Sequence, residues 1–335
     1  MLAKPMRILY VFEERIPEEL RQLVIDSFPR TEFVLDTMTY SEPEKQQCAK
    51  MRWADAVLFA PGRHLSEAVF ESASHVRLMQ LWSSGYDKFN TAAARKYGIP
   101  VANNGGANAI SVAEHTLLLM LSVNKRLPDS HARTVQGRWA GNSHGTDMFL
   151  LQDKTLGIVG FGNIGRAVAQ RAAAFQMRIL YSDPHRAPEQ VERQVAARRC
   201  SLDELLSSSD IVSLHVHLNA STEGMIGQRE LDLMKRSALL INVSRAQLVE
   251  TEALTESLRT GNIRGAGLDV YDDEPTRPGD PLLQHPYVVA TPHMAGSTYD
   301  AYVAALTNCV QNFCRVRDGL EPLWVVNEEH EHALA

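Results

Sequence analysis

The sequence lacks the features that mark several large classes of protein. No apolar run approaches the ~20 residues that a membrane-spanning helix needs. The first residues, Met1–Arg7, lack the apolar segment of a secretory signal peptide, so we expect a cytoplasmic protein. Acidic residues (40) outnumber lysine and arginine (34), which gives a net charge of −6. This balance provides no basic patch for nucleic acid or for an anionic membrane surface.

Cysteine is also scarce, and its spacing is irregular. The four cysteines form no CxxC pair: Cys48, Cys200, Cys309 and Cys314. Scattered, unpaired thiols fit a reducing compartment, and each is expected to fill space in a core. We therefore predict neither a disulfide framework nor a metal site.

What the sequence does contain is a regular alternation of short apolar runs and amphipathic stretches. Its 335 residues exceed one ordinary core and suit two domains. Early in the chain, strands are predicted at Met6–Val11, Ala56–Ala60 and Val76–Leu81, and helices at Pro17–Phe28 and Glu42–Trp53. Strands that alternate with helices indicate βαβ units and a parallel sheet.

Two clusters of helix-breaking residues divide the chain. NNGG, at Asn103–Gly106, precedes a long apolar helix predicted from Ser111 to Lys125, and TPHMAG, at Thr291–Gly296, marks the second crossing. The expected domains are residues 1–104 with 297–335, and residues 105–296. Between the first crossing and the next strand, Pro128–Phe149 is predicted to be a polar, irregular arm with Trp139 as its large apolar residue. Either this arm packs on a partner subunit, or it is a surface loop with a tucked tryptophan.

The strongest local signal is the segment GIVGFGNIGR. Gly160, Gly162 and Gly165 form GxGxxG directly after an apolar strand and before a helix, which is typical of dinucleotide binding. The first glycine allows a tight turn, the second lets a pyrophosphate approach the backbone, and the third lets the helix pack against the strand. The amides of Asn163 and Ile164 would then open a helix whose positive end faces the phosphates.

Asp183 ends the next predicted strand, where a carboxylate accepts hydrogen bonds from the adenosine ribose hydroxyls. A carboxylate at this place also repels a 2′-phosphate, which favours NAD over NADP. His185 and Arg186 follow directly, and a cation there could accommodate that phosphate, so NADP stays open. Asp183 could otherwise serve only as a turn residue beside Pro184.

Three further segments each follow a predicted strand of the second domain: NVSRA, GLDVYDDEP and TPHMAG. Ligands of open α/β sheets bind at the carboxyl ends of strands, so Arg245, Glu274 and His293 are expected to converge beside the nicotinamide. Arginine can hold a carboxylate and polarise a keto oxygen. Histidine can exchange a proton with that oxygen, and a bonded glutamate would fix its tautomer and raise its pKa. Alone, each could be a surface or loop residue; their order favours catalysis.

The cofactor contacts are predicted to include Val243 and Asp269, near the ends of the predicted strands Ala238–Val243 and Gly265–Val270, and His215 and His217 of HVHL. By the two-residue period of a strand, both histidines lie on one face. A metal pair is discounted because no third ligand is evident. His217 could instead contact the adenosine half of the cofactor.

Together these segments resemble the D-isomer-specific 2-hydroxyacid dehydrogenase family over nearly the whole chain. The matching segments are SSGYDKFN, VAEHTLLLML, GIVGFGNIGR, INVSR, GLDVYDDEP and TPHMAG. The resemblance implies two doubly wound parallel-sheet α/β domains. One is a flavodoxin-like substrate-binding domain built from both termini, and the other an inserted Rossmann NAD-binding domain. It also implies hydride transfer between NAD(H) and a D-2-hydroxy acid or its 2-keto partner, in a homodimer joined through the coenzyme domains.

The resemblance assigns roles residue by residue. Arg245 would bind and polarise the substrate, and His293 with Glu274 would form the acid/base pair. The loop of Ser83, Ser84 and Gly85 would present backbone amides to the substrate carboxylate. Asp269 would tune the catalytic pair, although a structural role under the strand end fits it equally. Two departures stand out: Ala246 replaces the usual glycine, and His217 occupies a place where the family often has proline.

The substrate is less constrained. Glu274 argues against the formate dehydrogenase branch, which has glutamine there, and Ser84 against phosphite dehydrogenases, which have lysine. A small 2-keto acid such as glyoxylate or hydroxypyruvate is expected from family frequency, while the direction of the reaction stays open. Arg63 and His64 could bind a second polar group of the substrate, or be an exposed basic pair. The alternative function is a nicotinamide-sensing interaction protein of the same fold without significant turnover.

Overall fold

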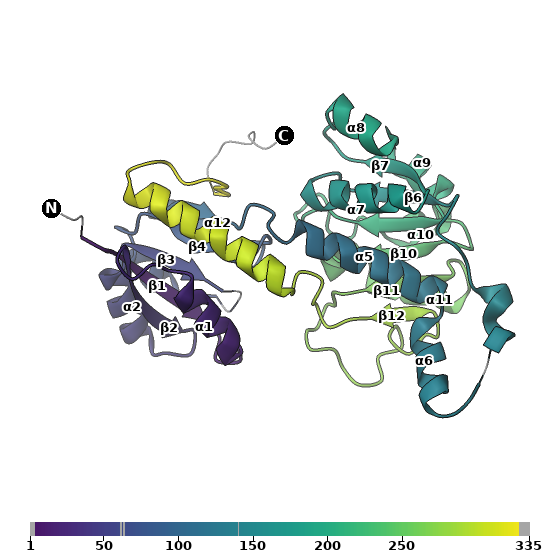
Figure 1. The fold of residues 1–335 in the computed structure, drawn as a ribbon, viewed down its shortest axis with the longest axis horizontal. Helices are drawn as coiled ribbons and strands as arrows, with labels where there is room; N and C mark the ends of the chain where they lie inside the picture. Colours follow the sequence, from purple (N-terminus) through teal and green to yellow (C-terminus); the bar gives the residue numbers. More distant parts are fainter. Residues whose placement is uncertain (1–3, 61, 63, 140, 328–335) are drawn as a thin grey trace. The chain divides into compact units, whose positions relative to one another are not determined.

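The computed structural model describes residues 4–60, 62, 64–139 and 141–327, and the chain divides into two compact units. Of the described residues, unit 1 contains those up to Asn108 and those from Tyr299 to Asn327, and unit 2 runs from Ala109 to Thr298. Each unit is built on one parallel sheet with helices on both faces (Figure 1). The predicted α/β class with two doubly wound parallel sheets is therefore confirmed.

Unit 1 contains a five-stranded sheet in the order β2-β1-β3-β4-β5, with every pair parallel. Its strands are β1 (Met6–Phe12), β2 (Phe33–Thr39), β3 (Ala56–Phe59), β4 (Met79–Leu81) and β5 (Val101–Ala102). Its helices are α1 (Glu18–Asp26), α2 (Glu44–Trp53), α3 (Glu67–Ser72), α4 (Thr91–Lys96) and α12 (Tyr299–Arg317).

Apart from the edge strand β2, whose residues are mostly exposed or partly buried, the strands of unit 1 are buried on both faces. Along β1, Ile8 and Tyr10 pack toward α1 and α12, whereas Leu9 and Val11 pack toward α2, α3 and α4. This alternation follows from the two-residue period of a strand. Because both faces are covered, the strands read as continuous apolar runs, as expected for a parallel sheet.

Unit 2 contains a seven-stranded sheet in the order β12-β11-β10-β9-β6-β7-β8, again with every pair parallel. Its strands are β6 (Thr155–Val159), β7 (Arg178–Ser182), β8 (Ala197–Arg199), β9 (Ile211–Leu214), β10 (Leu239–Asn242), β11 (Gly265–Leu268) and β12 (Val288–Ala290). Its helices are α5 (Ala109–Asn124), α6 (Leu127–Val135), α7 (Asn163–Ala174), α8 (Glu189–Val195), α9 (Leu202–Ser208), α10 (Gln228–Leu233) and α11 (Thr251–Arg259), with 3-10 turns η1 (Gly141–Asp147) and η2 (Ala246–Leu248).

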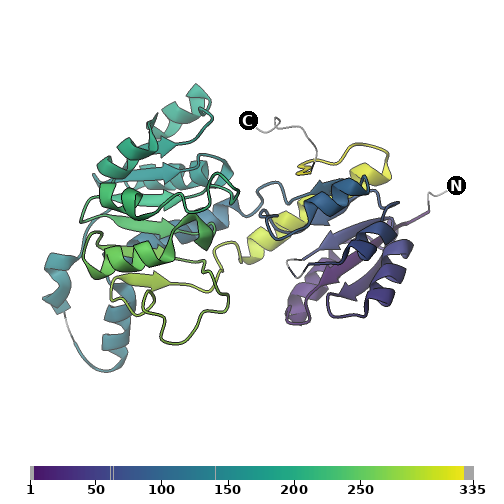
Figure 2. The ribbon, with the colours of Figure 1, turned by 180° about the vertical axis from the view of Figure 1, so that it is seen from behind.

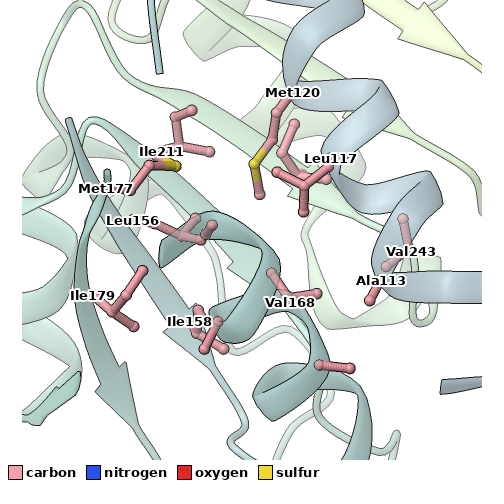
Figure 3. Packing of buried hydrophobic residues seen from close by; sticks show 14 of the residues in the cluster. Ala113, Leu117, Met120, Leu156, Ile158, Val168, Met177, Ile179, Ile211 and Val243 are labelled. Carbon is pink, nitrogen blue, oxygen red and sulfur yellow. The ribbon is translucent and has the colours of Figure 1, made fainter. Parts of the chain in front are cut away.

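Helices α5 and α7 cover one face of this sheet. Figure 3 shows Leu117 and Met120 of α5 and Val168 of α7 packed in one apolar cluster with Leu156 and Ile158 of β6. Burying side chains of this size contributes about 1.5–3 kcal/mol each. Helices α9, α10 and α11 cover the opposite face, which Figure 2 shows from behind. The sheet is thus fixed from both sides, and its strand ends hold the loops that follow them in place.

The segment predicted as an irregular arm is more ordered than expected. It contains helix α6 and the turn η1, and Pro128 lies in the first turn of α6, where a missing N–H costs nothing. The expectation of an irregular polar segment was therefore wrong for these residues. In the part of the chain that the structure describes, every helix is too short or too polar to cross a membrane.

Candidate active site

The glycine loop between β6 and α7 has the geometry that its sequence predicts. Gly160 has a φ of 92°, and a Cβ there would lie 2.7 Å from the backbone of His215. A Cβ on Gly165 would overlap the carbonyl oxygen of Gly160, so this position needs glycine for close packing. At Gly162, by contrast, a Cβ would meet nothing within 4 Å. This open face leaves the backbone at the start of α7, from Asn163, accessible to a pyrophosphate.

Asp183 is bound to the glycine loop. Its Oδ2 accepts a hydrogen bond from the Phe161 N–H at 2.7 Å, and its Oδ1 accepts from the His185 N–H at 2.8 Å. A carboxylate has about four lone-pair sites, so these two bonds leave capacity for ribose hydroxyls. The position therefore fits the predicted contact with the adenosine half of the cofactor.

Of the two cations that follow Asp183 in the sequence, Arg186 has a carboxylate partner of its own. Arg186 forms an ion pair with Glu192 of α8 at 3.0 Å, and this hydrogen bond lowers the pKa of the Glu192 carboxyl. The guanidinium beside Asp183 is instead that of Arg199, which donates to the carbonyl oxygens of Asp183 and Pro184 at 2.8 Å. The sequence reading missed Arg199 because it belongs to β8 and approaches Asp183 only across the sheet.

The two histidines of HVHL do not share a strand face, so that prediction was wrong. Strand β9 ends at Leu214, and the two-residue alternation does not continue beyond it. The Nε2 of His215 lies 2.8 Å from the Ser213 hydroxyl, and burial lowers the pKa of His215 to about 3. His217 is exposed, and its carbonyl accepts the Thr222 hydroxyl. Among the described residues, no cluster of three or more His, Cys, Asp or Glu side chains could hold a metal ion.

Val243 follows β10, and its side chain packs in the apolar cluster of Figure 3. The predicted contact of Val243 with a cofactor would therefore have to come from its backbone.

Glu274 and His293 are in direct contact. The Nδ1 of His293 lies 2.9 Å from both carboxylate oxygens of Glu274, and the Tyr271 N–H donates to Oε1 at 3.2 Å. The carboxylate accepts the Nδ1 proton, so the imidazole is held in one orientation. Its Nε2 lies on the opposite side of the ring and is the nitrogen that can exchange a proton with a substrate.

Arg245 follows β10, two strands away from the end of β12 that precedes His293. Its carbonyl accepts from the Asn242 side chain at 2.8 Å, and its Nη1 donates to the Ser244 carbonyl at 2.7 Å. Ala246 begins η2 and does not have a positive φ, so alanine fits where the family usually has glycine. The loops after β10, β11 and β12 follow the carboxyl ends of adjacent parallel strands, the same edge as the glycine loop after β6.

Asp269 is completely buried and supports the segment that carries His293. Its carboxylate accepts from the Thr291 hydroxyl at 2.5 Å, the Met294 N–H at 2.9 Å and the Ala295 N–H at 2.8 Å. These contacts favour the structural role over the cofactor contact that the sequence predicted for Asp269.

Sequence reasoning also missed Tyr271, whose hydroxyl lies within hydrogen-bonding distance of the Thr291 and Leu268 carbonyls. Burial raises the pKa of Tyr271 to about 12, so the hydroxyl stays protonated and can donate. Its position three residues before Glu274 was visible in the sequence, but its partners were not.

The predicted carboxylate-binding loop, Ser83–Gly85, follows β4 in unit 1. Asn103 donates to the Ser84 carbonyl at 3.0 Å, and the Ser84 hydroxyl lies 2.6 Å from side-chain oxygens of both Asn104 and Asn108. Among the described residues, the N–H groups of the loop donate to no backbone carbonyl. The asparagines thus fix the loop while its amides stay available to an anion. Arg63 lies outside the described residues, and His64 is exposed.

Comparisons with known proteins agree with this geometry. Residues 117–295 match the family described as "D-isomer specific 2-hydroxyacid dehydrogenase, NAD binding domain". The chain is 37% identical to a glyoxylate reductase of Thermococcus gammatolerans over 292 residues, 86% of this chain and 87% of that protein.

Two solved structures extend the likeness to the fold. A glyoxylate reductase from Paecilomyes thermophila has a TM-score of 0.81 and 27% identity, covering 98% of this chain and all of that one (100%). An NAD-complexed D-isomer specific 2-hydroxyacid dehydrogenase from Lactobacillus delbrueckii has a TM-score of 0.81 and 25% identity, covering 96% of this chain and 100% of that one.

Proposed function

Because the chain belongs to the D-isomer specific 2-hydroxyacid dehydrogenase family, we propose that it reduces glyoxylate, or a similarly small 2-keto acid, with NADH. The protein is an NAD-dependent oxidoreductase that transfers a hydride between NAD(H) and a 2-keto acid or the corresponding 2-hydroxy acid. The observation that carries the proposal is the contact of His293 Nδ1 with Glu274, beside strands whose ends also hold Arg245 and the glycine loop. Similarity to glyoxylate reductases supports the choice of substrate.

Each residue has a separate task in this proposal. The Arg245 guanidinium holds the substrate carboxylate and stabilises the negative charge that develops on the keto oxygen. Bound NADH supplies the hydride to the carbonyl carbon. His293 delivers a proton from Nε2 to the keto oxygen, and Glu274 stabilises the imidazolium before that transfer. The products are the 2-hydroxy acid and NAD⁺, with one proton consumed.

The test is a panel of 2-keto acids with NADH and NADPH, followed by the loss of nicotinamide absorbance. The expected result is turnover of glyoxylate and hydroxypyruvate with NADH, with D-glycerate as the product from hydroxypyruvate. NADPH is expected to support slower turnover, since Asp183 would face its 2′-phosphate. The similarity to glyoxylate reductases does not favour the nicotinamide-sensing alternative. Tight NADH binding without turnover of any keto acid would nevertheless contradict the proposal and support that alternative.

We also propose a homodimer joined through unit 2. Helix α6 has no buried residue, and Leu127, Val135 and Trp139 are 52%, 68% and 87% exposed. Apolar side chains gathered on one arm support a contact with a second copy. Light scattering at micromolar concentration is expected to give the mass of a dimer, and Trp139→Ser is expected to weaken the dimer; a monomeric wild type would overturn this point.

The four unpaired cysteines support the further proposal of a reducing, cytoplasmic location, which cell fractionation tests.

A further inference from the structure

A buried histidine lies behind the catalytic loop and has no role in the mechanism above. His115 is on helix α5, between Ala113 and Leu117, two residues of the apolar cluster in Figure 3. Its side chain is only 8% exposed. A polar group buried on an apolar helix needs hydrogen-bond partners, so the partners of this imidazole indicate why it is there.

The His115 imidazole, the Thr291 hydroxyl and the Asp269 carboxylate form a series of hydrogen bonds. His115 Nε2 lies 2.8 Å from the Thr291 hydroxyl, which lies 2.5 Å from Asp269 Oδ1. Both oxygens of Asp269 accept backbone N–H groups, so this carboxylate acts as an acceptor and the Thr291 hydroxyl donates its proton to it. The hydroxyl oxygen then has only lone pairs to offer, and His115 must donate to it from Nε2.

This direction requires a neutral imidazole with its proton on Nε2. Burial lowers the pKa of His115, and the nearby Asp269 carboxylate, 3.5 Å from Nε2, opposes the shift without cancelling it. His115 is therefore neutral at pH 7, and the three hydrogen-bonded side chains His115, Thr291 and Asp269 together contain one negative charge, on Asp269. Hydrogen bonds that run in one direction polarise each other, so each donor strengthens the next bond.

This series of hydrogen bonds ends at the backbone of the segment that contains His293, the proposed acid. His293 has a φ of 51°, a left-handed conformation that a non-glycine residue keeps only where its surroundings enforce it. The enforcing contacts are the Met294 and Ala295 N–H groups on Asp269 and the His293 N–H on the Thr291 carbonyl at 3.0 Å. Whatever fixes Thr291 and Asp269 also fixes the direction of the His293 ring.

We propose that His115 is a positioning residue: through the Thr291 hydroxyl and the Asp269 carboxylate, it holds His293 where its Nε2 can reach the substrate. The inference rests on the acid/base role proposed for His293. It predicts that His115 affects the proton-transfer step and leaves the binding of NADH to the glycine loop unchanged. If His115 only filled space, replacing it would not slow the proton-transfer step selectively.

The kinetic test compares three variants with the wild type in the reduction of glyoxylate. His115→Leu keeps the volume and removes the donor, and is expected to lower kcat about tenfold with little change in KM, because small misplacements of a catalytic group cost up to about 100-fold. His115→Gln places an amide N–H near the position of Nε2 and is expected to restore most of kcat. Glu114→Gln is the matched control, since Glu114 is an exposed neighbour paired with Arg171, and it should leave kcat unchanged.

A folded His115→Leu protein with wild-type kcat would overturn the inference, as would an equal loss in His115→Gln. If His115→Leu does not fold, Thr291→Val breaks the same chain, with Thr291→Ser as its control. Loss of kcat in the first and not in the second supports the Thr291–Asp269 step through which His115 would act, and equal activity in both overturns the inference. Where both single variants fold, the double variant should be no slower than Thr291→Val alone, because His115 acts through that hydroxyl.

A measurement without turnover separates this inference from the proposed reaction. The NMR spectrum of protein labelled with ¹⁵N-histidine is expected to show His115 as a neutral imidazole with its proton on Nε2, assigned by its loss in His115→Gln. A charged ring, or a proton on Nδ1, would overturn the inference even in an active enzyme. If the wild type reduces no keto acid, the proposed reaction fails, and this spectrum still decides whether His115 donates to Thr291.

Discussion

The glycine loop and the histidine segment lie at the same edge of one sheet, but opposite features shape them. The glycine loop, Gly160–Gly165, is shaped by missing side chains: its backbone packs where no Cβ would fit, or stays open where a ligand approaches. The histidine segment, Thr291–Ala295, is shaped by side chains from distant parts of the chain, above all Asp269. Both contain a residue with positive φ, glycine in the first and histidine in the second.

This difference shows which residues determine the geometry of each kind of site. A glycine adopts a positive φ at little cost, so the loop is encoded by residues within a few positions of each other. A histidine in that conformation is strained, and the strain has to be offset by hydrogen bonds to a charged acceptor, worth about 1.5–3 kcal/mol each. The cofactor end is therefore a local feature of the sequence, and the catalytic end is a product of the tertiary structure.

The largest effect is expected where the catalytic end meets the substrate. His293→Asn removes Nε2 and keeps a side-chain N–H near the position of Nδ1 for Glu274, and asparagine tolerates positive φ. We expect kcat for keto-acid reduction to fall about 1000-fold, within the range of general-acid catalysis. The NADH dissociation constant should stay unchanged, because the glycine loop is not altered. A loss of less than tenfold in kcat would assign the proton to another group.

The next effect concerns the support beneath that residue. Asp269→Asn replaces one acceptor oxygen by an NH₂ group, which leaves a buried N–H without an acceptor and costs about 1–3 kcal/mol of the free energy of unfolding. Activity should fall about tenfold or more, since His293 is then less well held. Chemical denaturation and steady-state kinetics measure the two effects. An equally stable and active variant would show that the histidine segment does not depend on this carboxylate.

Much of the fold and part of the site could be predicted because they are local. The apolar run of β6, the glycines and Asp183 lie within one βαβ unit, and the structure places them as that unit requires. The resemblance also identified Glu274 and His293, which lie 19 positions apart and are in contact. Here the order of the segments along a parallel sheet, more than any single residue, carried the prediction.

What could not be predicted depends on where elements end and which strands are neighbours. The period-two argument for His217 failed because β9 stops at Leu214, a boundary that apolar character alone does not mark. Arg199 reaches Asp183 from the neighbouring strand β8, and His115 reaches Thr291 from α5; the two contacts span 16 and 176 positions of the chain. Single residues give no sign of such partners. These are tertiary contacts, and they occur at both the cofactor end and the catalytic end.

The glycine loop offers a matched pair of smaller effects. Gly162→Ala adds a methyl group in open space at a φ of −78°, so the stability should stay within about 0.5 kcal/mol, while the NADH dissociation constant rises about tenfold. Gly160→Ala forces a positive φ and a collision with the His215 backbone, so the stability should fall by about 1–3 kcal/mol. Unchanged NADH affinity in Gly162→Ala would show that the pyrophosphate does not approach this backbone.

The smallest effect is a pH dependence at the cofactor end. Burial lowers the pKa of His215 from 6.5 to about 3. Below pH 6.5, His215 therefore binds a proton in the unfolded protein but stays neutral in the folded protein. The stability contributed by neutral His215 is therefore present above pH 6.5 and lost as the pH falls toward the folded value. Between pH 6 and 5, the free energy of unfolding of the wild type should fall more steeply than that of His215→Gln, by up to about 1.4 kcal/mol per pH unit.

His215→Gln is suited to this comparison because its amide can still reach the Ser213 hydroxyl, which the Nε2 of His215 contacts at 2.8 Å. All other titrating groups are common to both proteins and cancel in the difference. Parallel curves of stability against pH would mean that His215 takes up its proton in the folded state as well. The cofactor end would then contain a protonatable imidazole next to Gly160, and its contrast with the catalytic end would rest on backbone geometry alone.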